Sequence, residues 1–238
     1  MERIFSIIVN LFERFAILFL SAEEEQLYHD SKKDTESEEE VKLEHRKTYL
    51  WLLDNGHGVE TSGKRSPRFE DGTQLLEYEF NRAIVKRIID RLDELGVASL
   101  NLVPGEHDVP LADRVALASA CDDKGLQKIY VSVHGNAATD LWSIASGVET
   151  YHYPNSQTGI ALATVFQKHL VQQTGWKDRG IKEAKFYVLR KTTMPAILTE
   201  NGFFSNKAQC EQMLSMEYRD KVAEAHVQAI LEIEKDGI

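Results

Sequence analysis

The sequence predicts a single α/β domain with a twisted, mostly parallel sheet and helices on both faces. From about residue 48 onward, short continuous apolar runs alternate with longer segments of helical periodicity. Continuous apolar runs are typical of strands that are buried on both faces of a parallel sheet. The length of 238 residues and the hydrophobic content of 42% are enough for one full core.

The first half of this domain alternates strand, helix and strand. Residues 49–53 form an apolar run that ends at the turn Asp54-Asn55-Gly56, which predicts a buried strand. Residues 76–95 have helical periodicity and stop at Gly96, a residue suited to end a helix. The apolar run at 97–103 predicts the next strand.

The second half repeats the alternation without any internal sequence repeat. Apolar periodicity predicts helices at 111–121, 160–173 and 217–234, and apolar runs predict strands at 128–133, 147–153, 186–189 and 196–199.

Two segments precede the domain, which we place at residues 48–238. Residues 1–22 are apolar with a narrow polar stripe, which fits a helix lying on a membrane through residues 1–20, or a weak export signal. An extra helix, or a start codon assigned too early, are the alternatives. Residues 23–47 are charged and lack apolar periodicity, which predicts a disordered linker.

Charge and cysteine content exclude several classes of protein. The formal net charge is −10 and no Lys/Arg-rich stripe offsets it, so nucleic acid is not expected as a partner. The two cysteines, Cys121 and Cys210, are too few for a disulfide framework or a Cys-rich zinc site, and we expect two buried free thiols.

Chemically capable residues follow three of the predicted strands. His57 follows the first strand, His134 the strand at 128–133, and Glu200 the strand at 196–199. The carboxyl ends of parallel strands meet at one edge of a sheet, where such folds place their functional groups. Imidazole nitrogen suits zinc, but a hydrolytic zinc site needs a third protein ligand besides an open position for water.

The helix that begins near residue 76 offers two carboxylates, Glu77 and Glu79. Glu77 shares the apolar face of the helix, whereas Glu79 shares a charged face. An inward carboxylate is costly unless it is paired or binds a metal, so Glu77 is the better ligand. His57, Glu77 and His134 would then hold one Zn²⁺ ion, and Glu200 would be free for acid–base chemistry. Spacing and helix face alone leave open that these histidines are structural.

We expect no direct role for the other six histidines, which fall in predicted loops, linker, strand or helices: His29, His45, His107, His152, His169 and His226.

Taken in order, the motifs resemble those of the zinc-dependent N-acetylmuramoyl-L-alanine amidases of the amidase-3 family, which includes cell-separation enzymes and phage endolysins. The matching segments are 53–58, 77–81, 111–114, 131–136, 147–151, 179–182, 186–190 and 195–206. The resemblance implies that His57, Glu77 and His134 are the zinc ligands and that Glu200 is the catalytic glutamate. It also implies peptidoglycan as the substrate, cleaved at the amide between N-acetylmuramic acid and L-alanine.

Two residues are candidate substrate contacts. Asn136 could hydrogen-bond the peptide or the tetrahedral intermediate, or could cap a local turn. Arg65 lies in the loop at 59–73, which either grips the acidic stem peptide or is an ordinary solvated loop. The sequence departs from the family's usual pattern at Asn55, Gly135, Thr199 and Asn201, which leaves the substrate preference open.

The absence of a recognisable cell-wall-binding module makes the chain similar to phage-type lysins. The site of action is then the cell wall, reached from the periplasm or the outside after export, or from the host cytoplasm for a phage lysin. Oligomeric state stays undetermined. Two rivals remain: another zinc hydrolase, such as a carboxypeptidase of the stem peptide, and a wall-binding protein without turnover.

Overall fold

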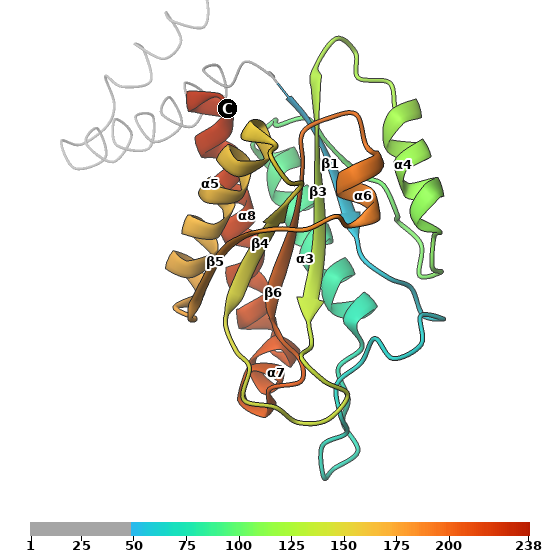
Figure 1. Cartoon of the computed structure of the whole chain (residues 1–238), viewed down its shortest axis with the longest axis vertical. Helices are drawn as coiled ribbons and strands as arrows, with labels where there is room; N and C mark the ends of the chain where they lie inside the picture. The colour runs from blue at the N-terminus through green and yellow to red at the C-terminus, as the bar shows by residue number, and fades with distance from the viewer. Residues whose placement is uncertain (1–48) are drawn as a thin grey trace, which may run out of the picture. The chain divides into compact units, whose positions relative to one another are not determined.

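The computed structural model describes residues 49–238 (Figure 1). The predictions for residues 1–22 and 23–47 therefore lie outside the described residues. The helices are α3 (Glu77–Glu94), α4 (Leu111–Ala120), α5 (Gln157–Thr174), α6 (Tyr187–Lys191), α7 (Lys207–Leu214) and α8 (Met216–Asp236). The strands are β1 (Tyr49–Asn55), β2 (Ser99–Asn101), β3 (Gln127–Asn136), β4 (Val148–His152), β5 (Asp178–Glu183) and β6 (Ala196–Phe203).

The six strands form one sheet in the order β2-β1-β3-β6-β4-β5. Strands β2, β1, β3 and β6 pair in parallel, as do β4 and β5. Strand β4 runs antiparallel to β6, so the sheet has a single antiparallel junction. The prediction of a mostly parallel sheet is confirmed.

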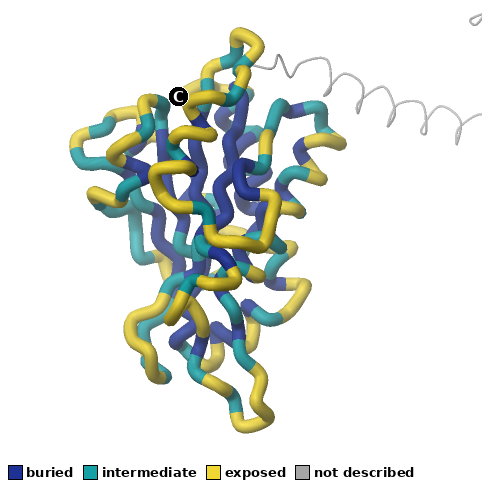
Figure 2. Tube along the Cα trace, turned by 90° about the vertical axis from the view of Figure 1, so that its right-hand side faces the viewer, coloured by how far each residue is buried: buried dark blue, intermediate teal, exposed yellow. Residues whose placement is uncertain are grey.

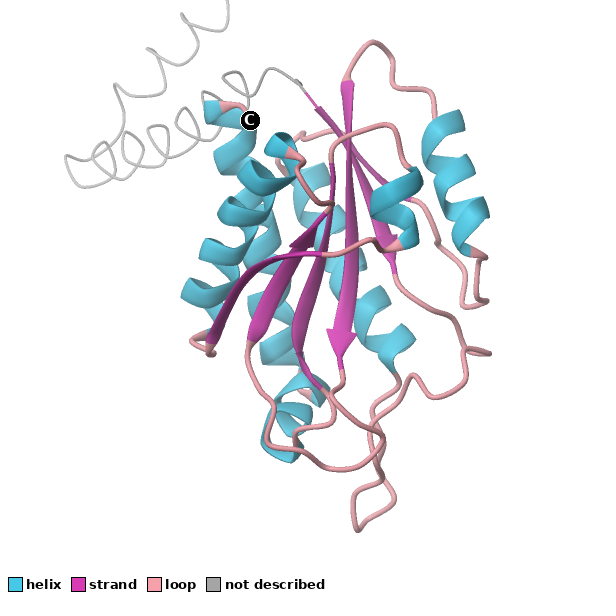
Figure 3. Cartoon of the chain, in the orientation of Figure 1, coloured by secondary structure: helices cyan, strands magenta, loops and turns pink. Residues whose placement is uncertain are grey.

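Helices cover both faces of the sheet, as predicted (Figures 1 and 3). Helices α3, α5 and α8 pack on one face and bury the larger core, while α4 and α6 cover a smaller core on the other. The alternation of side chains along each strand divides the residues between the two cores. In β1, Trp51 and Leu53 face the larger core, and Leu50 and Leu52 face the smaller one. Figure 2 shows the buried residues gathered in the middle of the domain, where β1, β3 and β6 are buried along most of their length.

One predicted strand is wrong. Residues 186–189 lie at the start of α6, a helix of five residues, because Val188 and Leu189 both point into the smaller core from adjacent positions. A four-residue apolar run carries too little periodicity to separate a short helix from a strand. Strand β5 was not predicted, since its sequence is polar and its residues are half-buried or exposed at the edge of the sheet.

Both cysteines are free thiols, as expected, but only Cys210 is buried and Cys121 is half-exposed. None of the helices within residues 49–238 combines the length and apolarity needed to cross a bilayer.

Candidate active site

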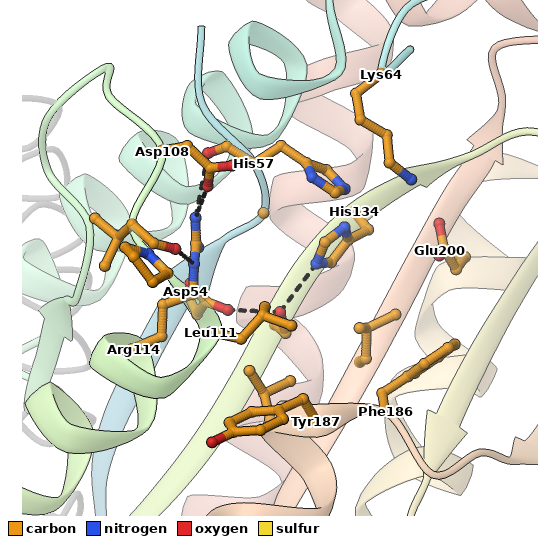
Figure 4. Close-up of a pocket in the computed structure, with 16 residues that line it drawn as sticks. Asp54, His57, Lys64, Asp108, Leu111, Arg114, His134, Phe186, Tyr187 and Glu200 are labelled. Atoms are coloured by element: carbon orange, nitrogen blue, oxygen red, sulfur yellow. Dashed lines mark hydrogen bonds and ion pairs between the residues drawn. The ribbon is translucent and has the colours of Figure 1, made fainter. Parts of the chain in front are cut away.

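A pocket of about 470 Å³ lies near the carboxyl end of the sheet and is lined in part by the first turns of α4 and α6 (Figure 4). One end of the pocket is polar and contains His57, Lys64, His134 and Glu200. The other end is apolar. Leu111, Phe186 and Tyr187 lie at this end (Figure 4), and the other apolar residues of the lining are Val109, Pro110, Val188 and Leu198. The pocket can therefore hold a substrate that has both polar and apolar parts.

The three predicted ligands lie together at the polar end. Glu77 Oε1 is 3.4 Å from His57 Nε2 and 3.1 Å from His134 Nδ1. The ligand atoms of the three side chains all lie within 4.8 Å of one another. The imidazole rings of His57 and His134 meet nearly at right angles, with centroids 5.0 Å apart. Residues far apart in the sequence thus form one compact cluster.

The strand register explains how His134 meets Glu200. These residues are partners in the parallel pairing of β3 with β6, so their side chains leave the same face of the sheet. Two residues earlier on β3, Ser132 points to the same face, and Asp54 is its register partner on β1. The sequence prediction put His134 and Glu200 just after strand ends, whereas both lie within longer strands.

Gly56 allows His134 to reach the cluster. A Cβ atom at this position would lie 2.0 Å from His134 Cε1, so only glycine leaves room for the ring. The next residue, His57, has a left-handed backbone with φ of 64°, which is strained for a side chain of its size. Its carbonyl accepts hydrogen bonds from Arg82 and Arg114, at 3.0 and 3.3 Å, and these hold the strained turn in place.

The cluster fits a divalent cation. Glu77 is 1% exposed, and its Oε2 atom has no hydrogen-bond partner among the described residues. Oε1 accepts from the Asn81 amide and the Gly135 backbone N–H, at 3.4 and 3.3 Å. Buried carboxylate oxygens are normally paired, so the free lone pairs of Oε2 favour a ligand that the protein does not itself supply. Two imidazoles and one carboxylate are a donor set that zinc uses.

Burial and neighbouring charges together shift the pKa values of His57 and Glu77 in the directions that suit metal binding. Desolvation lowers the pKa of His57 to about 4, although Glu77 opposes the shift. Burial alone would raise the pKa of Glu77, but the hydrogen bond from His134 and the nearby histidine charges hold it below its usual range. A neutral His57 and an ionised Glu77 are the forms that coordinate a metal.

A hydrogen-bond chain supports His134 from behind. Ser132 Oγ lies 3.1 Å from His134 Nε2 and donates to Asp54 Oδ2 at 2.7 Å (Figure 4). Asp54 in turn forms a buried ion pair with Arg114, which also contacts Asp108. Such outer contacts orient the ligands of metal sites. Sequence reasoning did not single out Ser132 for this role, although its position two residues before His134 places both on one face of β3.

Glu200 lies across the pocket from His57 (Figure 4). The pKa of its carboxyl group is unusually high. Burial, and then the nearby carboxylates of Glu77 and Glu149, raise its pKa to about 8, while His134 opposes the shift. Its Oε2 atom is buried without a partner among residues 49–238. A carboxyl group that titrates near neutral pH can both take up and release a proton.

Glu149 lies beside Glu200 across the antiparallel junction, where the two are register partners. Its carboxylate accepts from Asn136 and Tyr151 and forms ion pairs with Arg179 and Lys182. The Asn136 amide is thus engaged with Glu149 at 2.8 Å, and Asn136 is not among the residues that line the pocket. Substrate contact by Asn136 stays a prediction.

The remaining predicted residues lie away from the pocket. Glu79 is exposed and contacts the hydroxyl of Tyr78 at 3.1 Å. Arg65 is exposed and pairs through its backbone with Leu76, so its substrate contact stays a prediction as well. None of the described histidines without a predicted role lines the pocket; these are His107, His152, His169 and His226. His29 and His45 lie outside the described residues.

Lys64 is a pocket residue that sequence reasoning did not separate from the other cations of its loop. The apolar wall from Phe186 and Tyr187 was also missed, because the start of α6 was predicted as a strand. The adjacent apolar and aromatic residues Phe186 to Leu189 were the available signal.

Comparison with known proteins gives relatives over most of the chain. Residues 52–232 match the amidase-3 family model, described as N-acetylmuramoyl-L-alanine amidase. The uncharacterised protein YqiI of Bacillus subtilis is 34% identical over 180 residues, which are 75% of this chain and 81% of YqiI. The amidase LytC of the same organism is 31% identical over 73% of this chain, but the match spans only 33% of LytC. The endolysin of Bacillus phage SPP1 is 32% identical over 77% of this chain and 65% of the endolysin.

Solved structures have the same fold. The N-acetylmuramoyl-L-alanine amidase of Clostridium difficile 630 matches with a TM-score of 0.70 and 29% identity, over 80% of this chain and 98% of that one. The amidase AmiC2 of Nostoc punctiforme matches with a TM-score of 0.67 and 33% identity, over 78% and 96%. With its pocket, its ordered motifs and a match over residues 52–232, the chain belongs to the amidase-3 family of N-acetylmuramoyl-L-alanine amidases.

Proposed function

We propose that this protein is a zinc-dependent hydrolase that cleaves the amide bond between N-acetylmuramic acid and L-alanine in peptidoglycan. One zinc ion would be held by His57, Glu77 and His134, and Glu200 would serve as the general acid–base. The observation that carries the proposal is the convergence of the three ligand atoms within 4.8 Å, beside a pocket that is lined by His57, His134 and Glu200.

Zinc bound there would supply Lewis-acid polarisation of the scissile carbonyl and of the attacking water. The protein supplies the rest. Glu200 would accept a proton from the water at a carboxylate oxygen and pass it to the departing amine nitrogen. The pKa of Glu200, raised to about 8 without metal, would fall with a dication in the neighbouring cluster, because opposite charge favours the carboxylate. The apolar end of the pocket would exclude water from one side of the bound substrate.

Digestion of purified peptidoglycan, with and without a chelator, tests the reaction. We expect mass spectrometry to find free stem peptides with an N-terminal L-alanine, and we expect zinc to restore activity lost to the chelator. Shortened stem peptides still joined to muramic acid would instead show a carboxypeptidase. Absence of any release with every metal tried would favour a wall-binding protein without turnover.

Variants test the residue roles. Glu200→Gln keeps the shape of the side chain but removes its basicity, so we expect bound zinc to remain and turnover to fall by at least ~100-fold. His57→Ala and Glu77→Ala should lose bound zinc. Glu79→Ala is the matched control, because Glu79 lies two residues from Glu77 on the exposed face of α3. Metal analysis that finds zinc lost from Glu79→Ala and kept in Glu77→Ala would refute the ligand assignment.

We also propose that the enzyme acts on the cell wall, either after export or, as a phage-type lysin, from the host cytoplasm. The similarity to the SPP1 endolysin supports the phage-type route, whereas YqiI and LytC, the other relatives described above, are Bacillus subtilis proteins and support a bacterial role. The phage-type route is tested inside a host. Expression inside a bacterial host together with a pore-forming holin should then cause lysis, and the Glu200→Gln protein should not. Intact cells after holin expression, with an active enzyme in the extract, would argue against a lysin role.

A further inference from the structure

Lys64 occupies a fixed place at the rim of the pocket. Its backbone carbonyl accepts a hydrogen bond from the N–H of Glu77 at 3.0 Å, so the first turn of α3 is tied to this residue. Beside it, Arg65 bridges to Leu76, and the buried Ser66 donates its N–H to Leu75 at 2.9 Å. The loop is therefore hydrogen-bonded across its base, and the stem of Lys64 starts from a defined position next to a predicted metal ligand.

The ammonium group of Lys64 points into the pocket and has no ion-pair partner among residues 49–238. Figure 4 shows Nζ directed into the space bounded by His57, His134 and Glu200. Arg114, the other cation lining the pocket, is neutralised by Asp54 and Asp108. Within the described part of the chain, Lys64 is thus a positive charge without an ion pair beside the site where the proposed reaction takes place.

An exposed lysine at the rim of the pocket can bind a negatively charged group of the substrate. Its flexible stem and compact charge match a carboxylate that arrives with the substrate. Figure 4 shows Lys64 and Asp54 on opposite sides of His134, and Lys64 takes no part in the buried ion pair of Asp54 with Arg114. A peptide carboxylate close to the scissile amide would meet this charge once the amide reaches the cluster.

Building on the proposed amidase function, we infer that Lys64 binds the carboxylate of the residue that follows L-alanine in the stem peptide. The enzyme would then discriminate stem peptides with a free carboxylate at this position from those in which it is amidated. Lys64 is in this view a specificity-determining residue, and its neighbour Arg65 is not the contact.

The experiment uses two muramyl dipeptides with the sequence L-alanyl-D-glutamate. Both carry the γ-carboxyl as an amide; the α-carboxyl is free in one and amidated in the other. For the zinc-loaded wild-type protein we expect kcat/KM to be roughly 10-fold higher for the dipeptide with the free carboxylate. This is the size expected for one charge-assisted hydrogen bond, and the difference should lie in KM and not in kcat. Lys64→Met should abolish the preference by slowing only the acidic substrate, and Lys64→Arg should keep part of it. Arg68→Met is the matched control, because it removes a positive charge from the same loop. The Arg68 guanidinium donates a hydrogen bond to the carbonyl of Gly72, and this variant should keep the preference.

Several outcomes would overturn the inference. Equal cleavage of both dipeptides by the wild type, an equal loss for both with Lys64→Met, or loss of the preference in Arg65→Met would each do so. The Glu200→Gln protein, titrated with both dipeptides by calorimetry, gives a separate binding measurement. A preference there without any turnover in the wild type would refute the amidase reaction but keep the carboxylate site, while equal binding would refute the site.

Discussion

His226 makes the stability of this protein sensitive to acid. The side chain is fully buried in α8, where Nδ1 lies 2.7 Å from the carbonyl of Val222 and Nε2 lies 3.0 Å from the hydroxyl of Thr199. Nδ1 can therefore donate and Nε2 accept, which is the neutral form of the ring. Burial lowers its pKa from 6.5 to about 4. The position is structural, but Thr199 precedes Glu200 on β6, so a charged His226 would disturb the strand beside the pocket.

The sign and size of the effect follow from the two pKa values. Between pH 6.5 and about 4 the unfolded chain binds a proton on this histidine and the folded protein does not, so acid favours unfolding. The contribution is fully present above pH 6.5 and is lost as the pH falls toward 4. Integrated from pH 7 to pH 5, the loss is about 2 kcal/mol for this one group, since each pKa unit corresponds to about 1.4 kcal/mol.

Urea denaturation of the metal-free protein and of His226→Gln, each at pH 7 and pH 5, isolates this contribution. Glutamine can donate to Val222 and accept from Thr199 but does not titrate. We expect the wild type to lose about 2 kcal/mol more than the variant between the two pH values, whatever the variant loses at pH 7. Other groups that titrate in this range cancel in the comparison. The same pH-dependent loss in both proteins would refute the argument.

Three further substitutions test the support of the cluster. Gly56→Ala places a Cβ 2.0 Å from His134, and overpacking of about 1–3 kcal/mol should weaken zinc affinity roughly 10- to 100-fold; unchanged affinity by titration would contradict the close approach. Arg114→Met leaves Asp54 buried without its cation and should lower the free energy of unfolding by about 3–5 kcal/mol in urea; a loss below about 1 kcal/mol would show that Asp54 is otherwise satisfied. Ser132→Ala breaks the chain behind His134 and should cost roughly 10-fold in zinc affinity while the fold persists by circular dichroism; wild-type affinity would exclude this role.

Strong local patterns made most of the fold predictable. The long amphipathic helix α3 and the buried strand β3 differ from their predicted bounds by only a few residues. The direction of β4 was not predictable, because its side chains alternate in the same way whether β6 runs parallel or antiparallel. Strand β5 and helix α6 depend on tertiary contacts at the sheet edge and over the smaller core, which outweigh weak local preferences.

The site was predictable to the extent that it depends on strand ends and helix faces. These placed His57, Glu77, His134 and Glu200 at one rim, and the structure brings them together. Lys64 could not be separated from Arg65 by sequence, since adjacent exposed cations in a loop differ only in which way the backbone turns them. The left-handed backbone of His57 could not be predicted from the sequence either, because the residue type alone does not determine φ.

The single antiparallel junction gives the connection between β3 and β4 an unusual freedom. Strand β3 ends at the edge of the sheet where β4 begins, so residues 137–147 never cross the sheet. They are tied to the following segment at Ser205, which bonds the backbone N–H groups of Ala138 and Ser143, and at Gln209, which bonds that of Gly147. An insertion between these anchors would lengthen the connection at the carboxyl end of β3 and leave the strand order intact. This connection is therefore a natural place to exchange or graft sequence when an enzyme of this architecture is to be adapted to a different cell wall.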